Sequence, residues 1–165
     1  MTMEYPQELY SNGRETLHED QILDSHKLYQ RHKPGYDWKE SEGLPDFTKI
    51  KIDPKEKKNN QSYNWEIFSS PAWARFNEKK EYQKEYAVVS YSAGTIRHIE
   101  RYDDLNLLEP DLLGVEHAPN EINYSHCQLY CTEKFANSDN LKGKKRAARL
   151  AMKHGANTIL KPFEE

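Results

Sequence analysis

The chain has 165 residues, a formal net charge of −3 at pH 7 and 36% hydrophobic residues. This length suits one domain with a core of modest size and argues against two full domains. Eleven tyrosines and three tryptophans supply large side chains that bury apolar area while keeping a polar group for the surface. Because the net charge is low, the composition argues against a wholly disordered chain and predicts a globular body with an aromatic-rich core.

Hydropathy and cysteine spacing indicate the compartment. No apolar run approaches the roughly 20 residues that a membrane helix needs, and the N-terminus lacks a basic region followed by an apolar one. Cys127 and Cys131 lie four positions apart, which along a strand is roughly 13 Å and beyond disulfide reach. We therefore expect a soluble, intracellular, cytoplasmic protein with reduced thiols and no membrane partner.

Residues 1–62 are predicted to form an N-terminal helical arm and a polar linker. Thr16, followed three residues later by a glutamate, reads as a capping box that begins a helix over residues 16–32. The alternation over residues 47–52 predicts a short edge strand with outward lysines. The main body is expected to comprise residues 63–165, and the boundary between it and the arm is expected in the polar stretch just before residue 63. Both parts are expected to make one folded unit.

The first half of the main body carries one strong local signal. Residues 63–68 are predicted to be a strand, and Ser70 followed by Pro71 is predicted to open a helix. Residues 86–99 are predicted to be a β-hairpin, because β-forming residues flank Gly94, which permits the positive φ of a tight turn.

The C-terminal part completes the predicted fold. Residues 121–131 alternate as a strand. Ser138 or Asp139 is predicted to cap a helix that runs to His154, and a last extended segment follows over residues 157–160. These elements predict an α+β fold in which two or three helices cover a mostly antiparallel sheet.

The strand over residues 121–131 separates two kinds of side chain. Its period of two places both cysteines and Leu129 on one face, and Tyr124, His126, Gln128 and Tyr130 on the other. The cysteine face is small and apolar, so we expect it to pack in the core. A straight strand also holds the two sulfurs too far apart for one zinc ion. No metal centre and no cofactor are predicted.

Three residues around this strand are candidates for catalysis. His117, Asn120 and His126 resemble, in order though not in spacing, the His-Asn-His set of a small metal-dependent nuclease fold. In such a site one histidine activates water and another holds a divalent metal against the phosphate. The alternative interpretation is structural, with Asn120 shaping a turn after Pro119 and His126 hydrogen-bonded among tyrosines.

Arg97 is the fourth candidate. If the predicted strands pair, an arginine beside two histidines would form a pocket for phosphate or carboxylate. The alternative is an arginine whose stem packs and whose head pairs with a nearby acid.

Charge is unevenly distributed along the chain. All seven charged residues from Asp103 to Glu133 are acidic, whereas the predicted last helix is basic over residues 142–153. Such a helix can contact nucleic-acid phosphates. The alternative is a solvated helix face that meets the acidic segment of its own chain or of a partner. The candidate binding residues are Tyr124, Gln128, Tyr130, Lys144, Lys145, Arg146 and Arg149.

Two functions follow from these patterns. The first is a small binding or adaptor protein that acts through a protein partner, because no complete catalytic constellation is present. The second is a metal-dependent phosphodiesterase or nuclease-like enzyme that uses His117, His126 and Arg97. The enzyme requires these three side chains to converge in one solvent-open cleft, whereas the binding protein allows them to scatter or be buried.

Overall fold

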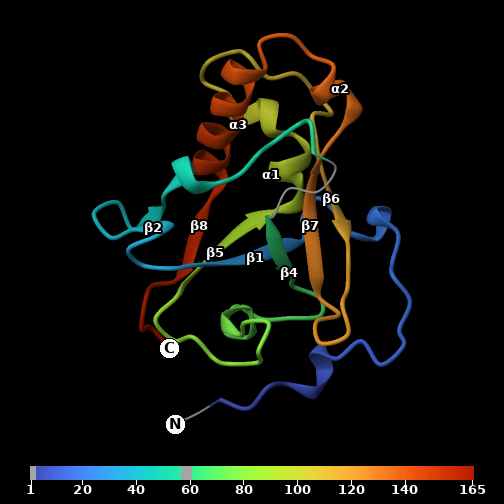
Figure 1. Cartoon of the computed structure of the whole chain (residues 1–165), viewed down its shortest axis with the longest axis vertical. Coiled ribbons are helices and arrows are strands. Elements are labelled where there is room, and N and C mark those ends of the chain that lie inside the picture. The colour runs from blue at the N-terminus through green and yellow to red at the C-terminus, as the bar shows by residue number, and fades with distance from the viewer. Residues whose placement is uncertain (1–2, 57–60) are drawn as a thin grey trace.

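A computed structural model of the chain describes residues 3–56 and 61–165 and has an α+β fold (Figure 1). Within these residues the main sheet has six strands in the order β6-β7-β4-β1-β5-β8, and all neighbouring pairs are antiparallel. The strands are β1 (Lys27–His32), β4 (Ser62–Trp65), β5 (Ala87–Ser92), β6 (Leu113–His117), β7 (His126–Cys131) and β8 (Asn157–Leu160). A second sheet pairs β2 (Trp38–Lys39) with β3 (Leu44–Pro45).

Helices and short 3₁₀ turns connect these strands. The α-helices are α1 (Ala93–Arg97), α2 (Glu133–Ala136) and α3 (Leu141–Gly155). The 3₁₀ turns are η1 (Gln7–Leu9), η2 (Glu19–Gln21), η3 (Phe47–Lys49), η4 (Trp73–Arg75) and η5 (Ile99–Tyr102). In the described parts of the chain, no helix is both long and apolar enough to cross a membrane.

The sheet separates a large core from a small one. On one face, Leu28 of β1 packs in a cluster that includes Ile96 of α1 and the inner side of α3. On the other face, Tyr29 and Val88 pack against Ala74 of η4. Figure 1 shows α1 and α3 on one side of β1 and β5, and the η4 segment on the other. Adjacent residues of β1 therefore enter different cores, as the two-residue period of a strand requires.

The predicted hairpin over residues 86–99 is only half correct. Its first half is β5, but its second half is α1, because Ser92 caps the helix by accepting a hydrogen bond from the Thr95 N–H at 3.0 Å. Gly94 serves close packing rather than a turn. A Cβ at this position would lie 3.1 Å from the Asp24 carbonyl oxygen, which accepts the Gly94 N–H at 2.9 Å.

The predicted helix over residues 16–32 is wrong. The chain there forms η2 and then β1, which lies between β4 and β5 near the middle of the sheet. Pairing on both edges and burial on both faces outweigh the local helix signals, since helices in proteins depend largely on tertiary packing. Residues 1–62 thus contribute an inner strand of the sheet, and the expected boundary at residue 62 falls at the start of β4.

Two other segments differ from prediction and four agree with it, among them the strand predicted over residues 63–68, which is present in part as β4. The expected edge strand over residues 47–52 is η3 and a buried extension, and the helix expected after Ser70 is reduced to η4. The strand near the C-terminal end of 121–131, the long last helix and the final extended segment are all present as β7, α3 and β8. Asn140, rather than Ser138 or Asp139, caps α3 through the Gly143 N–H. Part of the predicted polar linker, residues 57–60, lies outside the described residues.

Candidate binding cleft between β1 and β4

The two histidines predicted to act together lie on opposite faces of the sheet. His117 pairs with Cys127 across β6 and β7, so the adjacent His126 faces the other way. His117 is 4% exposed. Its Nδ1 accepts a hydrogen bond from the Leu17 N–H at 2.9 Å, and its Nε2–H donates to the Tyr124 carbonyl at 2.5 Å. Both ring nitrogens are therefore engaged inside the protein and hold no free lone pair for a metal or a substrate.

Asn120 and His126 lie at the turn between β6 and β7. The Asn120 side-chain oxygen accepts hydrogen bonds from the N–H groups of Ile122 at 3.1 Å and Asn123 at 2.9 Å. The His126 Nδ1–H donates to the Ala118 carbonyl at 2.7 Å. The asparagine thus shapes the turn, as the structural interpretation expects.

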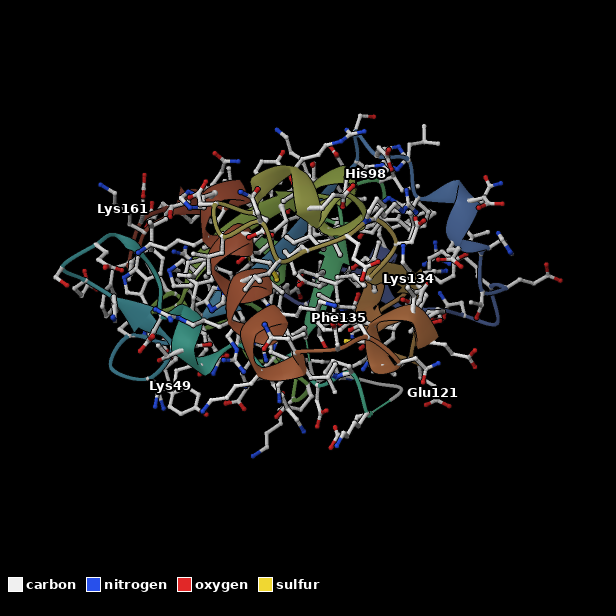
Figure 2. All side chains as sticks on the ribbon, turned by 90° about the horizontal axis from the view of Figure 1, so that it is seen from above. Lys49, His98, Glu121, Lys134, Phe135 and Lys161 are labelled. Atoms are coloured by element: carbon white, nitrogen blue, oxygen red, sulfur yellow. The ribbon has the colours of Figure 1, made fainter. Side chains whose placement is uncertain are left out.

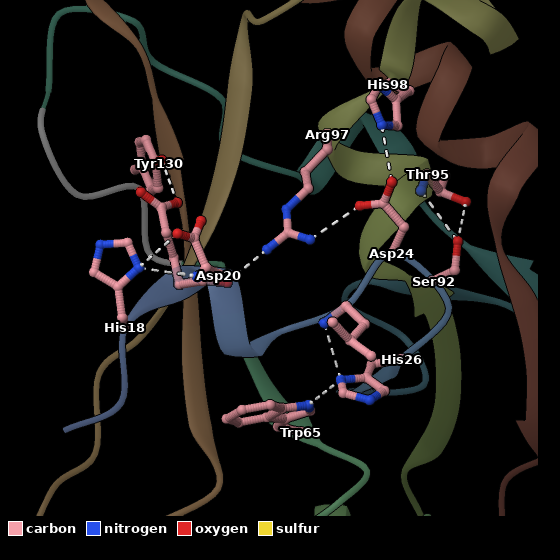
Figure 3. Close-up of polar contacts among 12 residues, drawn as sticks. His18, Asp20, Asp24, His26, Trp65, Ser92, Thr95, Arg97, His98 and Tyr130 are labelled. Carbon is pink, nitrogen blue, oxygen red and sulfur yellow. Dashed lines mark hydrogen bonds and ion pairs between the residues drawn. The ribbon is translucent and has the colours of Figure 1, made fainter. Parts of the chain in front are cut away.

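Arg97 belongs to a separate polar network between α1 and the segment before β1 (Figure 3). Its Nη1 pairs with Asp24 Oδ1 at 2.9 Å, and its Nη2 donates to the Glu19 carbonyl at 2.8 Å. His98 Nε2 lies 3.0 Å from the other Asp24 oxygen. The hydrogen bond from Arg97 lowers the pKa of Asp24 below its usual value, and His98 adds to this effect. The three side chains predicted to form a phosphodiesterase centre therefore do not share a cleft.

The basic helix α3 is partly neutralised by the chain itself. Lys144 is 5% exposed, and its ammonium group lies 2.9 Å from Asp139 and 3.4 Å from Glu109. Arg149 Nε donates to the Ile50 carbonyl at 3.1 Å. Two of the four cations proposed to contact a partner are thus engaged internally.

The other two cations of α3 remain at its surface. Lys145 is half-buried and Arg146 is exposed, and neither forms an ion pair with any described residue. Farther along α3, His154 Nε2 pairs with Asp104 at 2.8 Å. The acidic segment over residues 103–133 therefore does face this helix, as the alternative interpretation of its charge expects.

The aromatic candidates near β7 mostly serve the interior. Tyr124 precedes the strand and is 4% exposed, so it does not share the outer face of β7 as predicted. Its ring lies 3.9 Å from the Arg14 guanidinium carbon. The Tyr130 hydroxyl donates to Glu19 at 2.6 Å. Gln128 is half-buried on the face of β7 that turns away from the cysteines.

A cleft opens where two neighbouring strands of the sheet part. β1 and β4 pair at only two positions, the last of which joins Tyr29 to Asn64. Beyond this point β1 continues along β5 to His32, whereas β4 pairs with β7 back to Ser62. Figure 1 shows β1 crossing β4 and β7 at a wide angle. The remaining parts of β1 and β4 face one another without a main-chain ladder.

The cleft has a volume of about 600 Å³ and extends from the N-terminal arm and η4 to the η3 segment. Aromatic rings and side-chain amides predominate in its walls. The aromatic lining residues are Tyr5, Tyr29, Tyr36, Trp73 and Phe76. The amide lining residues are Gln30, Gln61, Asn64, Asn77, Asn120 and Asn123. The volume of the cleft falls within the range of about 300–1,000 Å³ that is usual for ligand-binding clefts.

The inner end of the cleft holds two buried polar atoms that lack partners. The Gln30 Nε2–H donates to Gln61 Oε1 at 2.9 Å across the parted strands, and His32 Nδ1 lies 3.1 Å from an Asp37 carboxylate oxygen. Gln30 Oε1 and His32 Nε2 have no hydrogen-bond partner among the described residues. An unsatisfied buried polar atom costs about 1–3 kcal/mol, so each invites an explanation by function.

Cations in the cleft are accompanied by anions or rings. Arg31 pairs with Glu78 at 3.6 Å, and burial lowers the pKa of its guanidinium. Lys49, the last residue of η3, lies at the outside of the molecule (Figure 2), 5.8 Å from the centre of the Tyr36 ring. Lys51 lies 2.9 Å from the carboxylate of a nearby glutamate. The cleft therefore has mixed charge and no uncompensated basic track.

The sequence contains a signal for this cleft within the segment that is predicted to be a helix. Gln30 and His32 stand two apart, as side chains on one face of a strand do. Once the segment is recognised as an inner strand, two polar residues on its core-facing side indicate an internal polar site. Of the predicted site residues, Asn120 and His126 line the cleft, whereas Arg97 and His117 do not.

The described residues contain no group of three or more histidine, cysteine, aspartate or glutamate side chains placed to hold a metal ion. The fold and the cleft together define an α+β domain with a polar cleft inside its sheet. No protein-family model, curated protein or solved structure matches the chain.

Proposed function

We propose that this protein is a binding protein that holds an extended segment of a protein partner in the β1–β4 cleft. The observation that carries the proposal is the parting of β1 and β4, which leaves two strand edges facing a cleft of about 600 Å³. Strand edges bind extended peptides through main-chain hydrogen bonds, and neighbouring pockets then select side chains.

The walls of the cleft support a polypeptide ligand. Among the lining side-chain amides, Gln30 keeps a buried Oε1 that has no partner among the described residues, and this acceptor matches the N–H donors of a peptide backbone. Trp73 and Phe76 supply apolar area beside these amides. A nucleic acid is disfavoured because binding to phosphates depends on available cations, and Arg31 and Lys51 are paired with carboxylates.

A random peptide library displayed on phage tests the proposal. The library is selected on the wild-type protein, and the enriched peptides are measured by fluorescence anisotropy on two variants of matched bulk. Ser62→Trp places a large ring at the cleft from an exposed position of β4, and Lys142→Trp places the same ring on the exposed side of α3. We expect Ser62→Trp to weaken binding at least about tenfold, or about 1.4 kcal/mol, and Lys142→Trp to leave it unchanged.

Three outcomes would overturn the proposal. Selection yields no enriched peptide, or the enriched peptides bind Ser62→Trp as tightly as the wild type, which would place them outside the cleft. In a parallel arm, a fluorescent oligothymidylate that binds the wild type but not Ser62→Trp would assign the cleft to single-stranded nucleic acid instead.

A further inference from the structure

We infer that the inner end of the β1–β4 cleft is a subsite for a carboxamide group, so that the bound segment carries an asparagine or glutamine there. This inference rests on the proposed function for its macromolecular ligand, but its chemistry concerns only Gln30, His32, Gln61 and Asp37. All four residues line the cleft. Gln30 is 8% exposed and His32 is 2% exposed, so both are built into the wall rather than displayed on a surface.

The neighbours of His32 fix which of its nitrogens is the acceptor. Its Nδ1 lies 3.1 Å from an Asp37 carboxylate oxygen, which can only accept, so Nδ1 carries the proton. In the neutral ring Nε2 then presents a lone pair. Nε2 is buried and has no hydrogen-bond partner among residues 3–56 and 61–165.

Gln30 presents a second acceptor in the same place. Its side-chain NH₂ group donates a hydrogen bond to Gln61 Oε1 at 2.9 Å, whereas its own Oε1 is buried without a partner among the described residues. Gln30 and His32 stand two positions apart on one strand and project from the same face, with Cα atoms roughly 6–7 Å apart. Two unpartnered acceptors on one face of a strand can each take one hydrogen of a single NH₂ group.

Other ligand groups fit this end of the cleft less well. A carboxylate or a phosphate has only acceptors and would face two more acceptors. An ammonium has three N–H donors and a guanidinium has five, so two acceptors would leave the other donors without partners. A neutral carboxamide supplies two N–H donors without charge. The carbonyl oxygen of the ligand can accept a hydrogen bond from the side-chain NH₂ group of Gln61. The side-chain oxygen of Gln61 already accepts from Gln30.

A titration with blocked amino acids tests the subsite without any macromolecular ligand. N-acetylglutamine methylamide is added to ¹⁵N-labelled protein, and the His32 imidazole nitrogens and Gln30 side-chain NH₂ group are followed by NMR. N-acetylleucine and N-acetylglutamate methylamides serve as matched probes. We expect only the glutamine compound to move the His32 Nε2 signal in the direction of a nitrogen that accepts a hydrogen bond. The inference is overturned if all three compounds act alike or if none acts at millimolar concentrations.

Variants then connect the subsite to the peptides selected on the whole cleft. Gln30→Leu removes one acceptor while keeping a side chain suited to burial, and Gln61→Leu removes the bridging amide from the opposite strand. Each should weaken the binding of an enriched peptide about tenfold. Each should also abolish the difference between that peptide and its version with glutamine or asparagine replaced by leucine. Thermal melting of both variants shows whether they remain folded.

The outcomes separate this inference from the proposed function. Some peptides could lose affinity for Ser62→Trp and yet bind the wild type equally well when their glutamine or asparagine is replaced by leucine. This result would refute the carboxamide subsite and still support peptide binding in the cleft. A His32 signal that responds to the glutamine compound, in a protein that selects no peptide, would support the subsite and refute peptide binding.

Discussion

At the scale of single residues, His117 shows how a candidate catalytic group can be a structural one. Its two ring nitrogens are committed to the Leu17 N–H and the Tyr124 carbonyl, an arrangement that only the neutral ring can make. Burial lowers the pKa of His117 below its ordinary value of 6.5, and the nearby Arg14 adds to this effect. The unfolded chain therefore takes up a proton at a higher pH than the folded protein does.

The pH dependence of stability follows from that difference. The stability that the neutral ring supplies is fully present above about pH 6.5, and it is lost as the pH falls from there towards the lowered pKa of the folded state. Asp24 also has a lowered pKa, but its effect is confined to pH values near and below its ordinary 3.8. We predict that the free energy of unfolding in urea decreases between pH 7 and pH 5.

His117→Gln checks the assignment. This variant should be less stable than the wild type at pH 7. The difference in the free energy of unfolding should be smaller at pH 5, because only the wild type loses the stability that a neutral His117 supplies. His18→Gln, at an exposed histidine of the N-terminal segment, should keep the full decrease of the wild type. An equal slope in His117→Gln would contradict the prediction.

Residue-level patterns were most reliable where one strand face is apolar. The period of two over residues 121–131 correctly places Cys127 in the core, where burial raises the pKa of its thiol. The same pattern failed at Tyr124, because the strand begins only at His126 and the preceding turn redirects that ring. A period fixes alternation within a strand, but it does not fix where the strand begins.

At the scale of elements, a glycine on β6 lets a neighbouring strand reach the N-terminal segment. The Tyr130 ring passes over Gly114, and its hydroxyl donates to Glu19 at 2.6 Å. A Cβ at Gly114 would lie 2.3 Å from the Tyr130 ring, so that ring would have to move. We predict that Gly114→Ala destabilises the protein by about 1–3 kcal/mol, as overpacked substitutions do.

A double-mutant cycle isolates that clash. In a Tyr130→Ala background the ring atoms nearest to the added methyl group are absent, so Gly114→Ala should cost much less than in the wild type. The free energies come from urea denaturation of the four proteins. Equal costs in both backgrounds would show that the ring is not the reason for the glycine.

Element types were predictable where local signals and tertiary position agree. α3 has a cap, an apolar stripe and a terminal glycine, and it forms near the predicted residues. β1 carries helix-compatible residues but lies between two strands, and α1 follows a strand whose last serine is also a helix cap. In both cases the deciding fact is the neighbour in space, which one segment of sequence does not contain.

The same limit applies to the cleft at the scale of the whole molecule. Its walls come from the N-terminal arm, β1, the η3 segment, β4, η4 and the turn before β7. It exists because β1 and β4 diverge, and that divergence depends on the different partners each strand has on its far side. Local periodicity predicts the polar side chains of the walls but not their convergence.

At the same scale, the buried side chain of Arg75 joins the C-terminal tail to the rest of the fold. Arg75 is fully buried, and no carboxylate pairs with it among the described residues. Its guanidinium instead donates to the carbonyl oxygens of Tyr86 at 2.9 Å, of Lys161 at 2.8 Å, and of Glu164. It thereby joins η4, the entry to β5 and the C-terminal tail.

Replacement of Arg75 by methionine should weaken the attachment of the C-terminal tail. Methionine keeps much of the apolar stem but leaves the three part-buried carbonyl oxygens without their donors, so we predict a loss of about 2–4 kcal/mol in the free energy of unfolding. Hydrogen exchange should accelerate in β8 and the tail after it, which begin with Asn157. The matched control is Lys84→Met, which removes an exposed ion pair to Glu165 in the same tail and should change neither quantity appreciably. Unchanged exchange in β8 of Arg75→Met would show that the tail is held by other contacts.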